Sequence, residues 1–240
     1  MELANQSSIE ESITKSEITI TGRLVDASNA TLFGSVPSLI DDSSISVIYK
    51  PIAGERPLWD FTEGNLASRE VAAYQLSREM GLDLVPFTIL REGPYGLGAV
   101  QKWIDIDEEF DLITFSQSKD SNLRWMALFD AVINNTDRKI GHLLKDSSGR
   151  LFGIDHGVSF HSENKLRTVL WQWRNMDFLH SEISVLSNLL TNRTVIESRL
   201  QPLLSSTEIS ALFGRISLLL ENGKFPEPSG EWPAIPWPPV

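Results

Sequence analysis

The chain has 240 residues, of which 41% are hydrophobic and 22% are charged, as in soluble globular proteins and unlike disordered ones. It has no cysteine, which excludes disulfides, thiolate metal sites and cysteine nucleophiles. Its 32 acidic and 21 basic residues give a net charge of −11, which argues against nonspecific nucleic-acid binding and stable association with anionic membranes. No apolar run is long enough to span a bilayer, and the polar N-terminus does not look like a secretory signal. We therefore expect a cytoplasmic protein.

The first half of the chain is predicted to be rich in strands. Residues 1–16 are polar with little apolar periodicity, and we expect them to be frayed. Apolar and polar residues then alternate between turn-forming stretches, which predicts five strands. These strands are expected at residues 17–25, 31–36, 45–50, 84–90 and 98–104, with residues 26–30 at the tip of the first hairpin. One helix is expected over residues 65–80, where helix formers are followed by Gly81.

The second half is predicted to be mostly helical. An apolar helix is expected over 121–135, a hairpin over 142–154, and two or three helices over 181–222, the last of them capped by Ser205 and Glu208. The Pro- and Trp-rich end of the chain is expected to lie extended on the surface. The predicted organisation is therefore α+β. Its expected parts are a frayed segment 1–16, an N-lobe 17–104, a helical C-lobe 105–225 and a tail 226–240.

Three polar clusters fall at strand ends or in loops, where catalytic residues concentrate. They are Lys50 at the end of ISVIYK, the stretch NNTDRKIGH at 134–142, and IDHG at 154–157. The predicted hairpin brings Asp137 and Asp155 to one space. Two neighbouring carboxylates repel each other, and a divalent cation is the usual reason for such a pair. A lysine from a separate strand would add positive charge for a polyphosphate.

The order of these motifs resembles the protein-kinase-like superfamily, in which a strand lysine and a helix glutamate precede a catalytic loop and a metal-binding aspartate. The shape NTDR…IDHG is more similar to the phosphatidylinositol 3-/4-kinase-related branch and to HipA kinases. The stretches YKPIAGERPLWDF and GIDHGVSFH are most similar to an actinobacterial phosphatidylinositol 3- and 4-kinase-like family. The resemblance covers about residues 17–175 and implies a two-lobed protein-kinase-like fold, with a small antiparallel N-lobe and a mostly helical C-lobe.

The resemblance also implies a nucleotide site in the N-lobe. Lys50 would contact the α- and β-phosphates and pair with Glu70. Residues 26–30, with the Ser28 and Asn29 side chains, would cover the phosphates in place of a glycine-rich loop. The hinge that hydrogen-bonds adenine would be formed by Gln101, Lys102 and Trp103.

In the C-lobe, the resemblance makes Asp137 the base that accepts the proton of the acceptor hydroxyl, and Lys139 the cation beside the transferring phosphoryl group. Asp155 would hold the metal. Where kinases place a metal-binding asparagine, this chain has His142, and imidazole suits Mn²⁺ better than Mg²⁺. The implied cofactors are ATP and Mg²⁺ or Mn²⁺.

Other charged and aromatic residues admit simpler roles. Asp130 lies within an apolar helix, where a buried acid needs a partner, and Arg138 is the candidate. The tryptophans at 171 and 173 are expected to anchor the C-terminal helices. Lys165 and Arg167 either hold an anionic acceptor or have no such role.

The expected function is ATP- and metal-dependent phosphoryl transfer to a hydroxyl of a soluble small molecule, such as an inositol derivative, without nucleic acid or a stable membrane partner. A protein substrate, as in HipA, is one alternative acceptor. A nucleotide-binding pseudokinase and an adenylyltransferase on the same fold are further alternatives. A zinc-type hydrolase built on Asp155 and the histidines at 142, 156 and 161 is the last.

Overall fold

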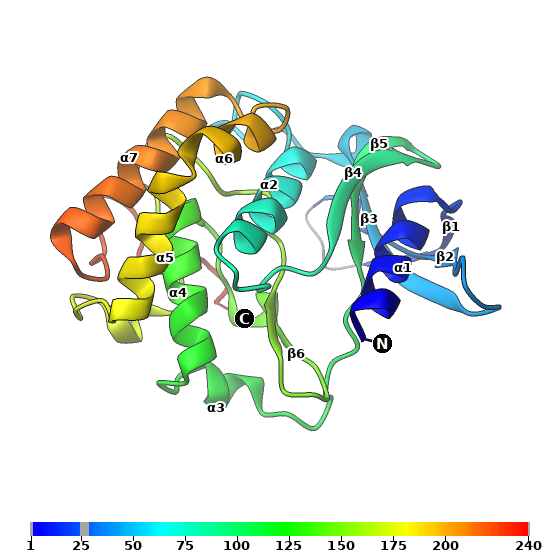
Figure 1. Ribbon diagram of the computed structural model, residues 1–240, viewed down its shortest axis with the longest axis horizontal. Coiled ribbons are helices and arrows are strands. Elements are labelled where there is room, and N and C mark those ends of the chain that lie inside the picture. Colours follow the sequence, from blue (N-terminus) through cyan, green and yellow to red (C-terminus); the bar gives the residue numbers. More distant parts are fainter. Residues whose placement is uncertain (1, 25–28, 240) are drawn as a thin grey trace.

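In the computed structural model, which describes residues 2–24 and 29–239, a five-stranded sheet is followed by a largely helical part (Figure 1). The sheet has the order β1-β2-β3-β5-β4, and all neighbouring strands are antiparallel. Its strands are β1 Thr19–Arg23, β2 Leu32–Pro37, β3 Ser44–Pro51, β4 Thr88–Gly93 and β5 Gly96–Lys102. All five predicted strands are confirmed, and Lys50 lies opposite Ala99 in the centre of the sheet.

The N-terminal segment corrects one expectation, because residues expected to be frayed form helix α1, Glu2–Lys15. The helix lies against the sheet, where Ile13 is completely buried among residues of β2, β3 and β5. Arg91 of β4 also donates hydrogen bonds to the carbonyls of Ile13 and Ser16, at 2.5 and 2.9 Å. Tertiary packing stabilises a short helix that propensity alone would leave marginal.

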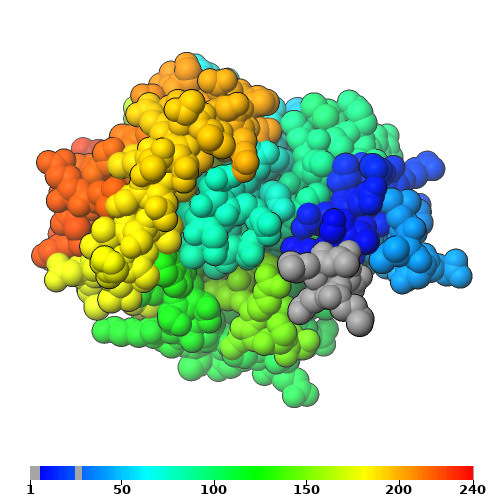
Figure 2. Space-filling view, viewed as in Figure 1, coloured from blue at the N-terminus to red at the C-terminus, as the bar shows by residue number. Residues whose placement is uncertain are grey.

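Helix α2, Leu66–Glu79, lies between the sheet and the helical part. The Asn65 side chain caps it by accepting a hydrogen bond from the Ser68 amide. In Figure 2 the surface of α2, in turquoise, is bordered by the yellow and amber surface of helices α5 and α6. The buried guanidinium of Arg69 joins α2 to α7 through Glu208, at 3.1 and 2.6 Å. This contact fixes the orientation of the helix that carries Glu70.

The helical part contains one large apolar core, which includes α4 and the three C-terminal helices. Its helices are α3 Leu112–Ser116, α4 Ser121–Ile133, α5 His180–Thr191, α6 Arg193–Leu200 and α7 Ser206–Asn222. The predicted capping box of Ser205 and Glu208 is present, and Gly223 ends α7 in the left-handed conformation. No helix in the described part of the chain is long and apolar enough to cross a membrane.

Two non-helical segments position the polar loops. The short hairpin of β6 Leu143–Lys145 and β7 Leu151–Gly153 separates the two loops that carry Asp137 and Asp155. The C-terminal tail, residues 224–239, forms no helix and packs against the loop after α4. Its Pro239 carbonyl accepts the Ile140 amide at 2.8 Å, and its Ala234 carbonyl accepts the Thr168 amide at 3.1 Å.

Candidate active site

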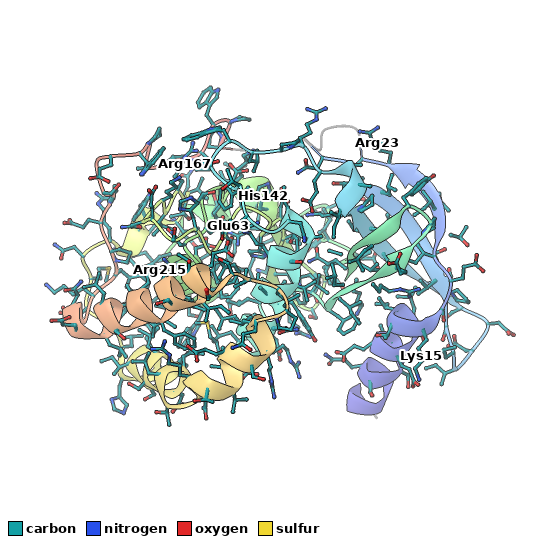
Figure 3. All side chains as sticks on the ribbon, turned by 90° about the horizontal axis from the view of Figure 1, so that it is seen from above. Lys15, Arg23, Glu63, His142, Arg167 and Arg215 are labelled. Carbon is teal, nitrogen blue, oxygen red and sulfur yellow. The ribbon has the colours of Figure 1, made fainter. Side chains whose placement is uncertain are left out.

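The predicted catalytic residues line one cavity of about 480 Å³ between the sheet and the helical part. Figure 3 shows two of its residues, His142 and Arg167, on the side of the molecule opposite α5. The predicted site residues that line the cavity come from both parts of the fold. They are Asn29, Lys50, Glu70, Asp137, Lys139, His142 and Asp155.

Lys50 links three elements at the centre of this cavity. Its ammonium group forms an ion pair with Glu70 of α2 and lies 2.9 Å from Asp155 Oδ1. Although burial lowers the pKa of Lys50, the Asp155 and Glu70 carboxylates raise it above its ordinary value. The Lys50 charge in turn lowers the pKa of Asp155. Both groups are therefore charged at neutral pH.

Glu70 and Asp155 are held in place by the backbone around them. Glu70 is only 2% exposed. Its carboxylate also accepts a hydrogen bond from the His156 amide at 3.0 Å. Asp155 has a positive φ of 60°, a conformation that is uncommon outside glycine and concentrates at functional sites. The turn at 154–157 is thus tied to α2 through the same glutamate that pairs with Lys50.

Asp137 and Lys139 lie in the loop after α4. The Lys139 ammonium is 3.3 Å from Asp137 Oδ2, and the Asn135 side chain accepts the Asp137 amide at 3.0 Å. Burial raises the pKa of Asp137, whereas the Lys139 charge opposes this rise. Asp137 is thus a partly buried carboxylate with a raised pKa, and such a carboxylate can act as a general base.

Arg138 connects the loop that carries Asp137 to the loop that carries Asp155. It is completely buried and forms an ion pair with Asp130, with Nη2 to Oδ1 at 2.9 Å, so the partner predicted for Asp130 is confirmed. The same guanidinium donates to the carbonyls of His142 and Ile154, both at 3.1 Å. Since one side chain ties together both loops, Asp137 and Asp155 are held in a fixed relation.

His142 and Asp155 are the two residues that could hold a divalent cation in this cavity. His142 Nε2 is 3.4 Å from Asp155 Oδ2. Burial lowers the pKa of His142 to about 4, so its imidazole is neutral at physiological pH and has a lone pair to offer. Its buried Nδ1 has no hydrogen-bond partner in the described residues. One imidazole nitrogen and one carboxylate suit Mn²⁺ at least as well as Mg²⁺.

The zinc-hydrolase alternative finds no support in this geometry. Among residues 2–24 and 29–239, no group of three or more His, Cys, Asp or Glu side chains is arranged to hold a metal. The His156 ring lies 2.7 Å from Arg138 Nη2, and the His161 ring lies 2.9 Å from the Asp60 carbonyl. These two histidines therefore have structural contacts.

An apolar pocket of about 140 Å³ adjoins the cavity at Lys50. Leu24, Ile48, Trp103, Ile104, Leu144 and Ile154 supply its apolar lining. The Lys102 and Trp103 amides are already bonded to the Phe87 and Ser46 carbonyls, at 2.8 and 3.0 Å. Gln101 uses its side-chain amide to donate to Thr88 at 2.9 Å. The predicted hinge thus borders a pocket of suitable shape, but its two amides are not free donors.

Of the two side chains predicted to cover the phosphates, that of Asn29 lies in the described part of the chain. The Asn29 side-chain oxygen accepts the Arg56 amide at 2.8 Å, so it fastens the hairpin loop to the segment after β3. Ser28, the other residue predicted here, lies outside the described residues. Sequence reasoning missed the segment after β3 itself and Trp232 of the tail, which also line the cavity.

The sequence is similar to that of one known protein. No protein-family model matches the chain. Protein Rv2133c of Mycobacterium tuberculosis is 37% identical over 260 aligned positions, which cover 92% of this chain and 92% of that protein. The chain belongs to the family of Rv2133c. The two sequences therefore align along nearly their whole lengths.

The similarity of this chain to solved structures shows that its fold is protein-kinase-like. The Golgi casein kinase with Mn/ADP bound has a TM-score of 0.59 at 12% identity, covering 92% of this chain and 75% of that chain. Hydra Fam20 with sugar has a TM-score of 0.58 at 16% identity, with coverages of 88% and 86%. The Helicobacter pylori proinflammatory kinase CtkA has a TM-score of 0.51 at 12% identity, with coverages of 89% and 94%. The predicted fold class is therefore confirmed.

Proposed function

We propose that this protein transfers the γ-phosphoryl group of ATP to a hydroxyl of a soluble small molecule, with a divalent metal as cofactor. The observation that carries the proposal is the convergence of Lys50, Glu70 and Asp155 with Asp137 and Lys139 in one cavity. The kinase-like fold alone would not suffice, since folds host many functions. These charged side chains are the parts that phosphoryl transfer requires.

In this proposal, Lys50 binds the α- and β-phosphates, and Glu70 keeps its ammonium group in place. Asp155 and His142 would hold the cation, which would neutralise charge on the phosphates. Asp137 accepts the proton of the acceptor hydroxyl while the hydroxyl oxygen forms a bond to the γ-phosphorus. The bond between that phosphorus and the bridging oxygen of ADP breaks. Lys139 stabilises the charge on the transferring group.

We place the adenine ring in the apolar pocket beside Lys50. Ile48 and Ile154 offer apolar contacts there, and Trp103 and Ile104 line the pocket where the chain leaves the sheet. Because the Lys102 and Trp103 amides are engaged within the sheet, we assign the hinge contact to Ile104, the next residue. Asn29 would act indirectly, through its hydrogen bond with the Arg56 amide at the cavity.

The branch of the superfamily and the acceptor class remain part of this proposal. The order of Lys50, Glu70, Asp137 and Asp155 supports the phosphatidylinositol 3-/4-kinase-related and HipA-like assignment. A net charge of −11 disfavours an anionic membrane surface or nucleic acid as the partner. The charge is compatible with a soluble hydroxylated acceptor, and we propose that this acceptor is cytoplasmic.

The test is a thermal melt of wild type and Asp155→Asn, each with ATP plus Mg²⁺ or Mn²⁺. A ligand present at a hundredfold excess over Kd stabilises the folded state by about 2.7 kcal/mol, or roughly 5–10 °C for a chain of this size. We expect this shift in wild type and its loss in Asp155→Asn. Asp42→Ala, which removes an exposed carboxylate away from the cavity, should behave like wild type. The absence of any shift in wild type would overturn the proposal.

Labelled ATP then separates the enzymatic alternatives. Transfer of label from the γ-phosphate to an acceptor supports the kinase. Transfer from the α-phosphate would identify an adenylyltransferase instead. Binding of metal–ATP with no transfer to small molecules or proteins would identify a pseudokinase.

A further inference from the structure

Part of the cavity lining has no role in the proposed phosphoryl transfer, and we call this part the outer half. It is formed by the segment after β3, the stretch at 165–167 and the C-terminal tail. The residues that concern us there are Arg56, Trp59, Asp60, Lys165, Arg167 and Trp232. Since Asp137 and Lys139 line the same cavity, a molecule in the outer half would be close to the proposed base.

Lys165 joins the three segments and is itself neutralised. Its side chain is only 5% exposed, and its ammonium lies 3.3 Å from Asp60 and 3.5 Å from Glu163. The same group lies over the Trp232 ring at 4.7 Å and the Trp59 ring at 5.5 Å. Lys165 therefore positions the two indole rings and is not available as a free cation for a ligand.

Two arginines of this lining form no ion pair in the described part of the chain, although the Arg167 charge, like that of Lys139, opposes the rise that burial causes in the pKa of Asp137. Neither Arg56 nor Arg167 has a carboxylate within 4.0 Å in the described part of the chain. Arg167 uses Nε to donate to the Pro233 carbonyl at 3.2 Å, so its terminal nitrogens remain available. In a chain with 11 more acidic than basic charges, two unpaired guanidinium groups on one cavity indicate recognition of an anion. Guanidinium groups bind phosphate and carboxylate through paired hydrogen bonds.

The C-terminal tail lines this outer half through Trp232 and is held there by hydrogen bonds. Besides Pro233, which holds Arg167, its Ala234 carbonyl accepts the Trp171 indole at 2.9 Å. These hydrogen bonds fix the tail on either side of the site, so Trp232 is held next to Lys165. An indole ring that faces a polar cavity can pack against the face of a polyol ring that carries its C–H groups.

We infer that the outer half is the acceptor site and takes a small soluble polyol that already carries a phosphate group. Arg56 and Arg167 would bind that phosphate, Trp232 would cover the ring, and a free hydroxyl would face Asp137. This inference rests on the proposed phosphotransferase function and adds the charge of its acceptor. The reaction that supplies this substrate would then be one that produces a phosphate monoester.

The test is calorimetric titration of myo-inositol 1-phosphate into wild-type protein saturated with the ATP analogue AMP-PNP and Mg²⁺, beside a titration with neutral myo-inositol. We expect the phosphate ester to bind at least about tenfold more tightly, since each charge-assisted contact contributes substantially. The double variant Arg56→Ala/Arg167→Ala and the single variant Trp232→Ala should each weaken binding about tenfold or more. Lys119→Ala, which removes an exposed cation outside the cavity, should bind as wild type does.

Several results would overturn the inference. Equal binding of the neutral polyol and the phosphate ester would show that the arginines do not select an anion. Displacement of AMP-PNP by the phosphate ester would assign both arginines to the nucleotide site. A wild-type protein that shows the metal–ATP melting shift but binds no phosphate ester would reject the inference alone. Phosphate-ester binding in a protein with no such shift would reject the phosphotransferase function, and the acceptor role with it.

Discussion

At the scale of single residues, the proposed chemistry depends most on Asp137. Its carboxylate lies in the cavity beside Lys139, with the Asn135 side chain bonded to its amide. General bases contribute roughly 10²–10⁴-fold to rate, so we expect Asp137→Asn to lower kcat by about that factor, with a smaller change in KM for ATP. Steady-state kinetics with labelled ATP measures both constants. A variant that keeps more than half of wild-type kcat would remove Asp137 from the role of base.

The acid limb of the pH profile gives a second test of the same carboxylate. Burial raises the pKa of Asp137, and the nearby Lys139 charge lowers it. Only the ionised carboxylate can accept a proton, so kcat falls as pH drops through this raised pKa. Lys139→Ala removes the opposing charge, and we expect the acid limb of its kcat profile to move to higher pH. An unchanged limb, or one moved to lower pH, would contradict this coupling.

In the proposed site, His142 is the residue that would set the preference between Mn²⁺ and Mg²⁺. In the described structure its neutral imidazole lies 3.4 Å from Asp155, where an amide oxygen would suit Mg²⁺ better. We expect His142→Asn to shift the ratio of Mn²⁺ to Mg²⁺ affinity toward Mg²⁺ by about tenfold, a change typical of altered metal surroundings. Metal titrations in the presence of AMP-PNP measure the ratio. An unaltered ratio would mean that His142 does not coordinate the ion.

Some residue contacts could be predicted from the sequence, and others could not. Asp130 lies in an apolar helix, so burial required a cationic partner, and Arg138 is that partner. The engagement of the Lys102 and Trp103 amides depends on where the sheet pairing ends, which no local pattern specifies. Trp232 reaches the cavity from 95 residues beyond Asp137, and its sequence neighbours give no sign of that contact.

At the scale of secondary structure, the orientation of α2 is the critical feature, since α2 carries Glu70. Its Arg69 is buried against Glu208 of α7. Removal of one partner leaves a buried charge uncompensated, so we expect Glu208→Gln to lower the free energy of unfolding by about 3 kcal/mol. Glutamine still permits the cap with Ser205, so the loss reports on the ion pair. Urea denaturation measures the change.

The control for this prediction is Glu11→Gln. Glu11 pairs with Lys15 across one turn of α1, and both side chains are more than half exposed. Exposed pairs of this spacing contribute about 0.5 kcal/mol or less. If the two substitutions destabilise the protein equally, the Arg69–Glu208 pair does not fix α2.

Local sequence predicted the elements with strong periodicity or clear caps, such as the five strands and α7. It did not predict α1, because the residues of that helix have weak amphipathicity and depend on Ile13 packing against the sheet. The β6–β7 hairpin was predictable from its turn, and with it the proximity of Asp137 and Asp155. The course of the tail was not, since Pro-rich segments have no internal hydrogen bonds to specify it.

At the scale of the whole molecule, the cavity depends on contacts between segments far apart in the chain. Lys50 of the sheet reaches Asp155 of the helical part across 105 positions. The tail then returns to the loop after α4, where Pro239 and Ala234 accept the Ile140 and Thr168 amides. The loop that carries Asp137 is consequently held by Arg138 from within and by the end of the chain from outside.

Deletion of residues 226–240 tests this dependence. It removes the acceptors for the Ile140 and Thr168 amides, each worth about 1 kcal/mol, and the packing of the buried Pro236. We expect a loss of about 2–3 kcal/mol, seen as a decrease in Tm of roughly 4–10 °C, with a larger proportional loss of kcat than of metal–ATP binding. Trp237→Ala removes a side chain that is 86% exposed and should change Tm little. If the deletion leaves both Tm and kcat at wild-type levels, the tail neither holds the catalytic loop nor forms a wall of the site.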